Sequence, residues 1–114
     1  MAESLLDIQV EDLKRVELVR VSGRIDSSNA AEFDRVLKEV SSRKHNIVLE
    51  LSGVEYMSSA GLRAMVAALK EAKAHNGSVL VAAANDKIRD TIALVGFQSL
   101  FPVFDDILEA VDSL

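Results

Sequence analysis

The sequence contains no cysteine and no tryptophan, and it has a single proline among its 114 residues. Without cysteine the chain can build neither a disulfide framework nor a thiolate metal site, and such a composition fits the reducing cytoplasm. The first residues lack both the basic and the long apolar segment of a signal peptide. No apolar run approaches the ~20 residues that a membrane-spanning helix needs. We therefore expect a cytoplasmic protein that does not associate with a membrane.

Positive charge is also scarce. The chain has 13 lysines and arginines against 18 aspartates and glutamates, and its formal net charge is −5. The basic residues are scattered among acids and form no basic face, so we expect no binding to nucleic acid. Hydrophobic residues make up 49% of the chain, which is typical of a globular rather than a disordered protein. This length fits a single domain spanning residues 1–114.

Motifs for cofactors are missing as well. No glycine-rich loop of the G-x-x-x-x-G-K-[ST] or G-x-G-x-x-G type occurs, so nothing indicates a nucleotide site. Glu50 and Glu55 have no companion residues to complete a metal site, and we interpret them as solvated or turn residues. Arg43 and Lys44 are interpreted as charges that complement the C-terminal end of a helix. We expect no cofactor.

Two strands are predicted at the start of the chain. Residues 5–13 alternate loosely, with Leu6, Ile8 and Val10 on the same side, which is typical of a half-exposed strand. Residues 16–21 are richer in valine and leucine, and Ser22-Gly23 is expected to end this second strand. Strands so close in sequence most simply pair as an antiparallel hairpin.

The rest of the chain alternates between helical and strand patterns. The predicted strands cover residues 47–51, 78–84 and 100–104, and the first of them is expected to end in a turn at Ser52-Gly53. The predicted helices begin near Ser27 or Ser28, near Ser59, after Asn85 or Asp86, and after Asp105-Asp106. Apolar residues at helical spacing are expected to face inward. They are Phe33, Val36, Leu37, Val40, Leu62, Met65, Ile88, Ile92, Val95, Ile107, Leu108 and Val111.

The resulting order is β-β-α-β-α-β-α-β-α. It predicts an α/β fold with a mixed, mainly parallel sheet of about five strands. In such a sheet the helices begin at the edge where the parallel strands end, and sites in α/β proteins usually lie there. Asp26, Ser58-Ser59 and Asn85-Asp86 each follow a strand and precede a helix. We therefore expect these residues to gather at one edge.

Three segments resemble the STAS domain of bacterial anti-sigma factor antagonists. They are Gly23-Arg24-Ile25-Asp26, Val48-Leu49-Glu50-Leu51-Ser52-Gly53-Val54 and Tyr56-Met57-Ser58-Ser59-Ala60-Gly61-Leu62. A later glycine-aromatic pair, Gly96-Phe97, fits the same family. The segments occur in order and at suitable spacings over nearly the whole chain, so the resemblance implies a single STAS-type domain.

This resemblance also implies a function. An unphosphorylated antagonist of this family binds an anti-sigma factor that is also a serine kinase, which releases the sigma factor. The kinase then phosphorylates a serine of the antagonist, here Ser59, and a PP2C-type phosphatase reverses the modification. The family's usual aspartate before the acceptor is replaced by Ser58, which becomes a rival acceptor. The implied partner-contact residues are Asp26, Ser58, Ser59, Ala60, Gly61 and Leu62.

Other interpretations of the serine pair remain open. Ser59 could be only an N-cap, whose hydroxyl accepts a hydrogen bond from the first turn of the helix. A hydrolytic nucleophile is disfavoured, because no G-x-S-x-G motif occurs and His45 and His75 are predicted at the opposite edge. The protein is therefore expected not to be an enzyme. It could also be a STAS binding subunit of a lipid-transport complex or of another signalling complex without a sigma factor.

Overall fold

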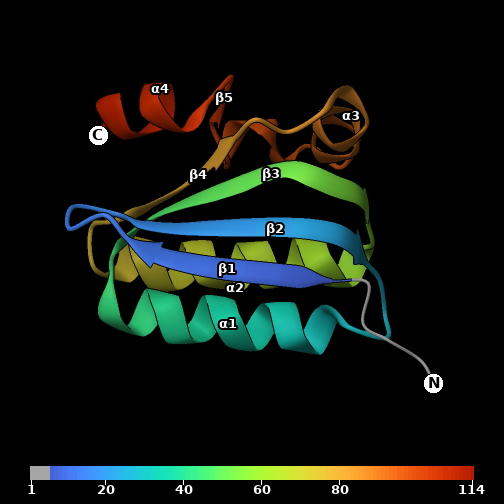
Figure 1. Cartoon of the computed structure of the whole chain (residues 1–114), viewed down its shortest axis with the longest axis horizontal. Coiled ribbons are helices and arrows are strands. Elements are labelled where there is room, and N and C mark those ends of the chain that lie inside the picture. Colours follow the sequence, from blue (N-terminus) through green and yellow to red (C-terminus); the bar gives the residue numbers. More distant parts are fainter. Residues whose placement is uncertain (1–5) are drawn as a thin grey trace.

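Five strands form a mixed β-sheet at the centre of the computed structural model, which describes residues 6–114. Their order is β1-β2-β3-β4-β5, with β1 antiparallel to β2 and the other neighbours parallel. The strands are β1 (Asp7–Asp12), β2 (Glu17–Ile25), β3 (Asn46–Met57), β4 (Ser78–Ala82) and β5 (Val103–Phe104). The helices are α1 (Ala30–Arg43), α2 (Ser59–Ala74), α3 (Asp86–Leu94) and α4 (Ile107–Asp112), with a short 3-10 helix, η1 (Phe97–Ser99). The predicted order of strands and α-helices is confirmed (Figure 1).

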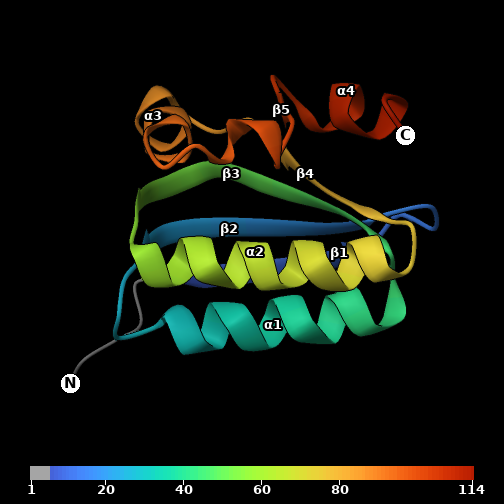
Figure 2. The same ribbon diagram turned by 180° about the vertical axis from the view of Figure 1, so that it is seen from behind.

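The two long helices, α1 and α2, cover the same face of the sheet. Figure 2 shows them side by side, with α2 in front of the strands and α1 below it, and Figure 1 looks onto the opposite face, where β1 and β2 are uncovered. The main core lies between these helices and the sheet, and it includes Phe33, Leu37 and Val40 of the predicted α1 stripe. A smaller apolar cluster lies where α4 contacts β3, β4 and β5. Within residues 6–114, no helix is both long and apolar enough to cross a membrane.

Strands β2 and β3 are both longer than the sequence analysis predicts. Each runs through its serine-glycine pair, Ser22-Gly23 or Ser52-Gly53, so the strand ends predicted there are wrong. At these pairs the register between the two strands shifts instead. A Cβ atom at Gly53 would lie 2.6 Å from Cβ of Ser22, so the strands approach closely only because this residue is glycine. The pairs therefore mark an irregularity of the β-bulge kind, which bends a strand without ending it.

An ion pair that the sequence analysis does not foresee joins β2 to α1. Glu17 is only 2% exposed, and its carboxylate accepts a hydrogen bond from Nε of Arg43 at 2.8 Å. Lys44 next to it pairs with Asp12 at 2.9 Å. A buried carboxylate requires such a partner, because burying an unpaired charge is costly. Arg43 lies in the last turn of α1 and Lys44 follows it, as the interpretation of their charges requires, and both also bind particular carboxylates of β1 and β2.

Two side chains predicted to face inward, Val95 and Leu108, are exposed instead, and so is Val10 of the half-exposed strand β1. The exposed fractions are 40% for Val10, 45% for Val95 and 70% for Leu108. Val95 lies beyond the last turn of α3, which ends at Leu94. In the short helix α4, Ile107 and Val111 pack against the smaller cluster as predicted, and the fully buried residue beside them is Ala110 instead of Leu108. Short helices carry too few apolar residues for their spacing to define a face.

The last two strands are shorter than predicted. β4 ends at Ala82, because Ala83 has a left-handed φ of 60° that turns the chain out of the sheet. β5 contains only Val103 and Phe104, and residues 100–102, which the sequence analysis predicts to belong to this strand, form a turn after η1. Pro102 lies at the edge, as expected for a residue without an N–H group, and its carbonyl accepts a hydrogen bond from N of Val81 at 2.9 Å.

In the connection from α2 to β4, the backbone at Gly77 lies very close to the backbone of His45. Asn76 has a left-handed φ of 62°, which turns the chain away after the last turn of α2. N of Gly77 donates to O of Ala72 at 2.7 Å. A Cβ atom at Gly77 would lie 1.9 Å from the carbonyl oxygen of His45, so no larger residue fits without backbone movement.

Gly77→Ala should therefore lower the free energy of unfolding by about 2–3 kcal/mol, because the His45 backbone must shift to admit the methyl group. Urea unfolding followed by circular dichroism measures this loss. Asn76→Gly is the matched control, since glycine adopts the left-handed conformation freely and should change stability by about 0.5 kcal/mol or less. Equal losses in both variants would show that the close approach is not the cause.

Candidate functional site

The ends of β2 and β3 lie side by side and place the predicted residues at one edge of the sheet. Ile25 pairs with Met57, and the next residue along β3, Ser58, donates its N–H to the carbonyl oxygen of Ile25 at 2.8 Å. The side-chain amide of Asn85 donates to the carbonyl oxygen of Val54 at 2.8 Å, which brings the start of α3 to the same region. Figure 2 shows the starts of α2 and α3 at the same end of the molecule. The predicted gathering of the three junctions is confirmed.

Ser58 and Ser59 occupy different positions at the start of α2. Ser58 is the N-cap: its Oγ accepts a hydrogen bond from N of Gly61 at 3.4 Å, and the residue is half-buried. Ser59 is the first residue of the helix and is exposed. The interpretation of Ser59 as the N-cap is therefore wrong. The hydroxyl of Ser58 supports the helix, whereas the hydroxyl of Ser59 faces solvent.

The next residues of the motif serve the packing of α2 on the sheet. Gly61 is buried, and a Cβ atom there would lie 2.8 Å from Ile25 and 2.9 Å from Met57. Leu62 is 5% exposed and belongs to the main core. Gly61 and Leu62 therefore hold the first turn of α2 against the sheet, and neither offers a surface to a partner in this conformation. Ala60 is half-buried, whereas Ser59 before it and Arg63 three residues after it are exposed.

Asp26 organises the turn that leads from β2 into α1. Its carboxylate accepts hydrogen bonds from Oγ of Ser28 at 2.5 Å and from N of Ser28 at 2.9 Å. These two bonds hold the pKa of Asp26 below the ordinary value of 3.8. The N-cap of α1 is Asn29, so the caps predicted at Ser27 or Ser28 are wrong. The side chain of Asn29 bridges the turn, accepting from N of Asp26 at 2.9 Å and donating to O of Arg24 at 2.8 Å.

The charges at this edge are mixed in sign. Arg24 lies over the ring of Tyr56, with 4.8 Å between the guanidinium carbon and the ring centroid. Glu55 and Arg63 are exposed. Helix α2 has no acidic residue in its first turn, whereas the other three α-helices have one each. The positive end of the α2 dipole is therefore the one left without a neighbouring carboxylate on its own helix.

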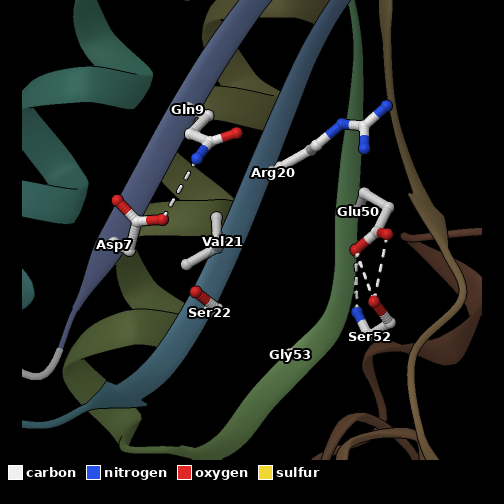
Figure 3. Close-up of a pocket in the computed structure, with 8 residues that line it drawn as sticks. All are labelled: Asp7, Gln9, Arg20, Val21, Ser22, Glu50, Ser52 and Gly53. Atoms are coloured by element: carbon white, nitrogen blue, oxygen red, sulfur yellow. Dashed lines mark hydrogen bonds between the residues drawn. The ribbon is translucent and has the colours of Figure 1, made fainter.

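A concave region separate from the serine pair lies on the uncovered face of the sheet. Figure 3 shows polar side chains of β1, β2 and β3 around a shallow pocket of about 200 Å³. The carboxylate of Glu50 accepts from N and Oγ of Ser52 at 2.9 and 3.0 Å, and Gln9 donates to Asp7 at 3.3 Å. These polar groups bind mainly to one another, and the pocket is separate from Ser59. Among the described residues, no group of three or more potential ligands is arranged for a metal ion.

Both histidines lie far from the serine pair. His45 follows α1 and His75 caps the C-terminal end of α2, and their rings are stacked with 4.6 Å between centroids. This position is at the end of the strands opposite to Ser59, as predicted. Neither imidazole can therefore act as a base for the Ser59 hydroxyl, which a serine nucleophile would require.

Comparisons with known proteins match this chain over most of its length. A family model described as STAS domain matches residues 7–110. BtrV of Bordetella bronchiseptica, named as a candidate anti-sigma factor antagonist, is 30% identical over 84 residues, which are 73% of this chain and 72% of that protein. An anti-sigma F factor antagonist of Paenibacillus polymyxa is 25% identical over 111 residues, covering 96% and 95%. The crystal structure of an anti-sigma factor antagonist from Mycobacterium paratuberculosis is 27% identical, with coverage of 95% and 92% and a TM-score of 0.82.

The different positions of the two serines predict different effects on stability. Ser58→Ala should lower the free energy of unfolding by about 1 kcal/mol, because it removes the N-cap of α2. Ser59→Ala should change it by less than about 0.5 kcal/mol, because the exposed hydroxyl makes no capping bond. Urea unfolding of the two variants and the wild type measures both effects. A larger loss in Ser59→Ala than in Ser58→Ala would reverse the assignment of the cap.

The Asp26 turn predicts a dependence on pH. Ser28→Ala removes the hydroxyl donor and should raise the pKa of Asp26 towards its ordinary value, whereas Ser27→Ala is the matched control and should leave it unchanged. NMR titration of the Asp26 carboxyl carbon measures both. Because the folded-state pKa is lowered, the ionised carboxylate stabilises the fold above about pH 4, and this contribution is lost as the pH falls through the folded-state pKa. The stability difference between wild type and Asp26→Asn should therefore shrink in acid; a difference that grows there would contradict this assignment.

Proposed function

Because this chain belongs to the STAS domain family, we propose that it is an anti-sigma factor antagonist controlled by phosphorylation of Ser59. In its unphosphorylated form it binds an anti-sigma factor serine kinase, and this binding releases the sigma factor. Phosphorylation of Ser59 by the same kinase ends the binding, and a PP2C-type phosphatase restores it. The names of the relatives support the antagonist role, and the resemblance of the serine motif supports the switch.

The observation that carries the proposal is the exposure of Ser59 on an anchored helix start. A kinase needs a hydroxyl that solvent and ATP can reach, and Ser59 is exposed whereas Ser58 is half-buried and engaged as the N-cap. This difference favours Ser59 over its rival. The anchoring of Ser58 to Ile25 and the packing of Gly61 present Ser59 in one defined position.

A phosphate at Ser59 would change the partner surface more than the fold. It adds about −1.5 to −2 charges and three acceptor oxygens. The free N–H groups of the first turn and the dipole of α2 stabilise such a group, and no acidic residue of that turn opposes it. A partner that covers the phosphate must instead bury an unpaired charge beside Asp26 and Glu55, which costs several kcal/mol. A change of 1.4 kcal/mol is already tenfold in affinity.

The proposed role is binding and not catalysis. The surface contributed by this chain consists of the exposed or half-buried residues Asp26, Ser58, Ser59 and Ala60. Gly61 and Leu62 support it from beneath. The Ser59 hydroxyl receives the phosphoryl group from ATP, and the kinase supplies the catalytic groups.

The proposal predicts the site of modification. Incubation with ATP and an anti-sigma factor serine kinase from the same organism should add one phosphate to the wild type, and fragment mass analysis should place it on Ser59. Ser59→Ala should remain unmodified. Ser58→Ala is the matched control and should be modified at Ser59, because loss of the cap costs only about 1 kcal/mol.

The same proteins test the binding switch. In calorimetric titrations with the kinase, Ser59→Ala should bind as tightly as the unmodified wild type, and Ser59→Asp should bind at least about tenfold more weakly. Phosphate that persists on Ser58 in Ser59→Ala would move the acceptor by one residue. If the kinase neither modifies this protein nor binds it, the proposal is contradicted. That result would favour the other role considered, a STAS subunit of a transport or signalling complex without a sigma factor.

A further inference from the structure

Arg63 lies one helical turn after Ser59 on the exposed surface of α2. Residues four apart on a helix are neighbours, with Cβ atoms about 5–6 Å apart. A negative group at the first position and a positive group four residues later form the more favourable order for an ion pair. Phosphorylation of Ser59 would create this order with Arg63.

The guanidinium of Arg63 is available for such a pair. Within residues 6–114, Arg63 forms no ion pair and no side-chain hydrogen bond. Its possible competitor on the neighbouring helix, Asp34, is paired with Lys38 at 2.9 Å. The other arginine at this edge, Arg24, lies over the ring of Tyr56. Within residues 6–114, Arg63 is thus a cation close to Ser59 on the same helix that lacks a partner.

The surroundings of Arg63 leave room for its side chain to turn towards Ser59. The residue lines a shallow hollow of about 270 Å³ between the first turns of α1 and α2. The other lining residues are Ala30, Ala31, Asp34, Ala60 and Ala64. Four of these five are alanines, so the hollow beside Arg63 is lined mostly by small side chains.

We propose that Arg63 is the counter-ion of phosphorylated Ser59 and holds the phosphate over Ala60. This inference rests on the proposed modification of Ser59. The guanidinium donates charge-assisted hydrogen bonds to the phosphate oxygens, while the first N–H groups of α2 stabilise the same group from the helix end. The paired phosphate then covers the hollow between α1 and α2. Phosphorylation therefore covers an alanine-rich surface as well as adding charge.

The test uses a protein in which phosphoserine is incorporated at position 59 during translation, so that it depends on no kinase. A titration followed by ³¹P NMR gives the second pKa of the phosphate, which is about 6 in an unperturbed phosphoserine. Pairing with Arg63 favours the dianion and should lower this pKa. Arg63→Gln should raise it again by about 0.5, and Arg63→Lys, which keeps the charge but loses the planar fork, should give an intermediate value.

Lys70→Gln is the matched control, because it removes one positive charge from an exposed position about 16 Å from Ser59 along the axis of α2. It should leave the phosphate pKa nearly unchanged. Equal shifts in Arg63→Gln and Lys70→Gln, or none in Arg63→Gln, would overturn the pairing. The unphosphorylated Arg63→Gln protein should have the same melting temperature as the unphosphorylated wild type, which excludes a general effect on folding. A kinase that fails to modify Ser59 would contradict the proposed function, whereas an unshifted phosphate pKa would contradict only the role of Arg63.

Discussion

The hydrogen bond from N of Ser58 to the carbonyl oxygen of Ile25 is the contact on which the candidate site depends. It joins the end of β2 to the first turn of α2, so that two segments far apart in sequence are fixed relative to each other. Gly61 makes this junction possible, because any side chain there would collide with Ile25 and Met57. The hydroxyl of Ser59 and the Asp26 turn both take their positions from this junction.

Electrostatics distinguishes α2 from the other helices around it. Each of the other α-helices carries an acidic residue in its first turn, and the start of α2 carries none. Asp26 lies nearby, but its carboxylate is engaged by Ser28 and stabilises the turn before α1. The helix end at Ser59 is thus neutral and exposed in the unmodified protein. A phosphate would supply the negative charge that favours a helix N-terminus, which makes this position suitable for a reversible modification.

The alternation of strand and helix patterns along the sequence predicts the fold well. The residues at which individual strands and helices begin and end depend on contacts that the sequence does not reveal. The alternation of strands and helices is sufficient for the order of elements and for the edge at which Asp26, Ser58-Ser59 and Asn85 meet. The serine-glycine pairs look like turns, and only the pairing of β2 with β3 shows that the strands continue through a register shift. The sequence does not show which of the two adjacent serines is the N-cap of α2. The choice depends on the residue whose N–H binds the carbonyl oxygen of Ile25, and the structure shows that this residue is Ser58.

The division of work between the two serines explains how one hydroxyl could be modified without harm to the fold. If the capping residue were also the acceptor, phosphorylation would replace the hydroxyl that accepts from N of Gly61 with a bulky group and would disturb the helix start. Here the cap is the residue before, and the acceptor lies on the solvent side of the first turn. The helix dipole, and in our proposal Arg63, stabilise the phosphate on the free protein, whereas a bound partner would have to bury it. Phosphorylation should therefore act in opposite directions on folding stability and on affinity, which separates this mechanism from a switch that works by unfolding.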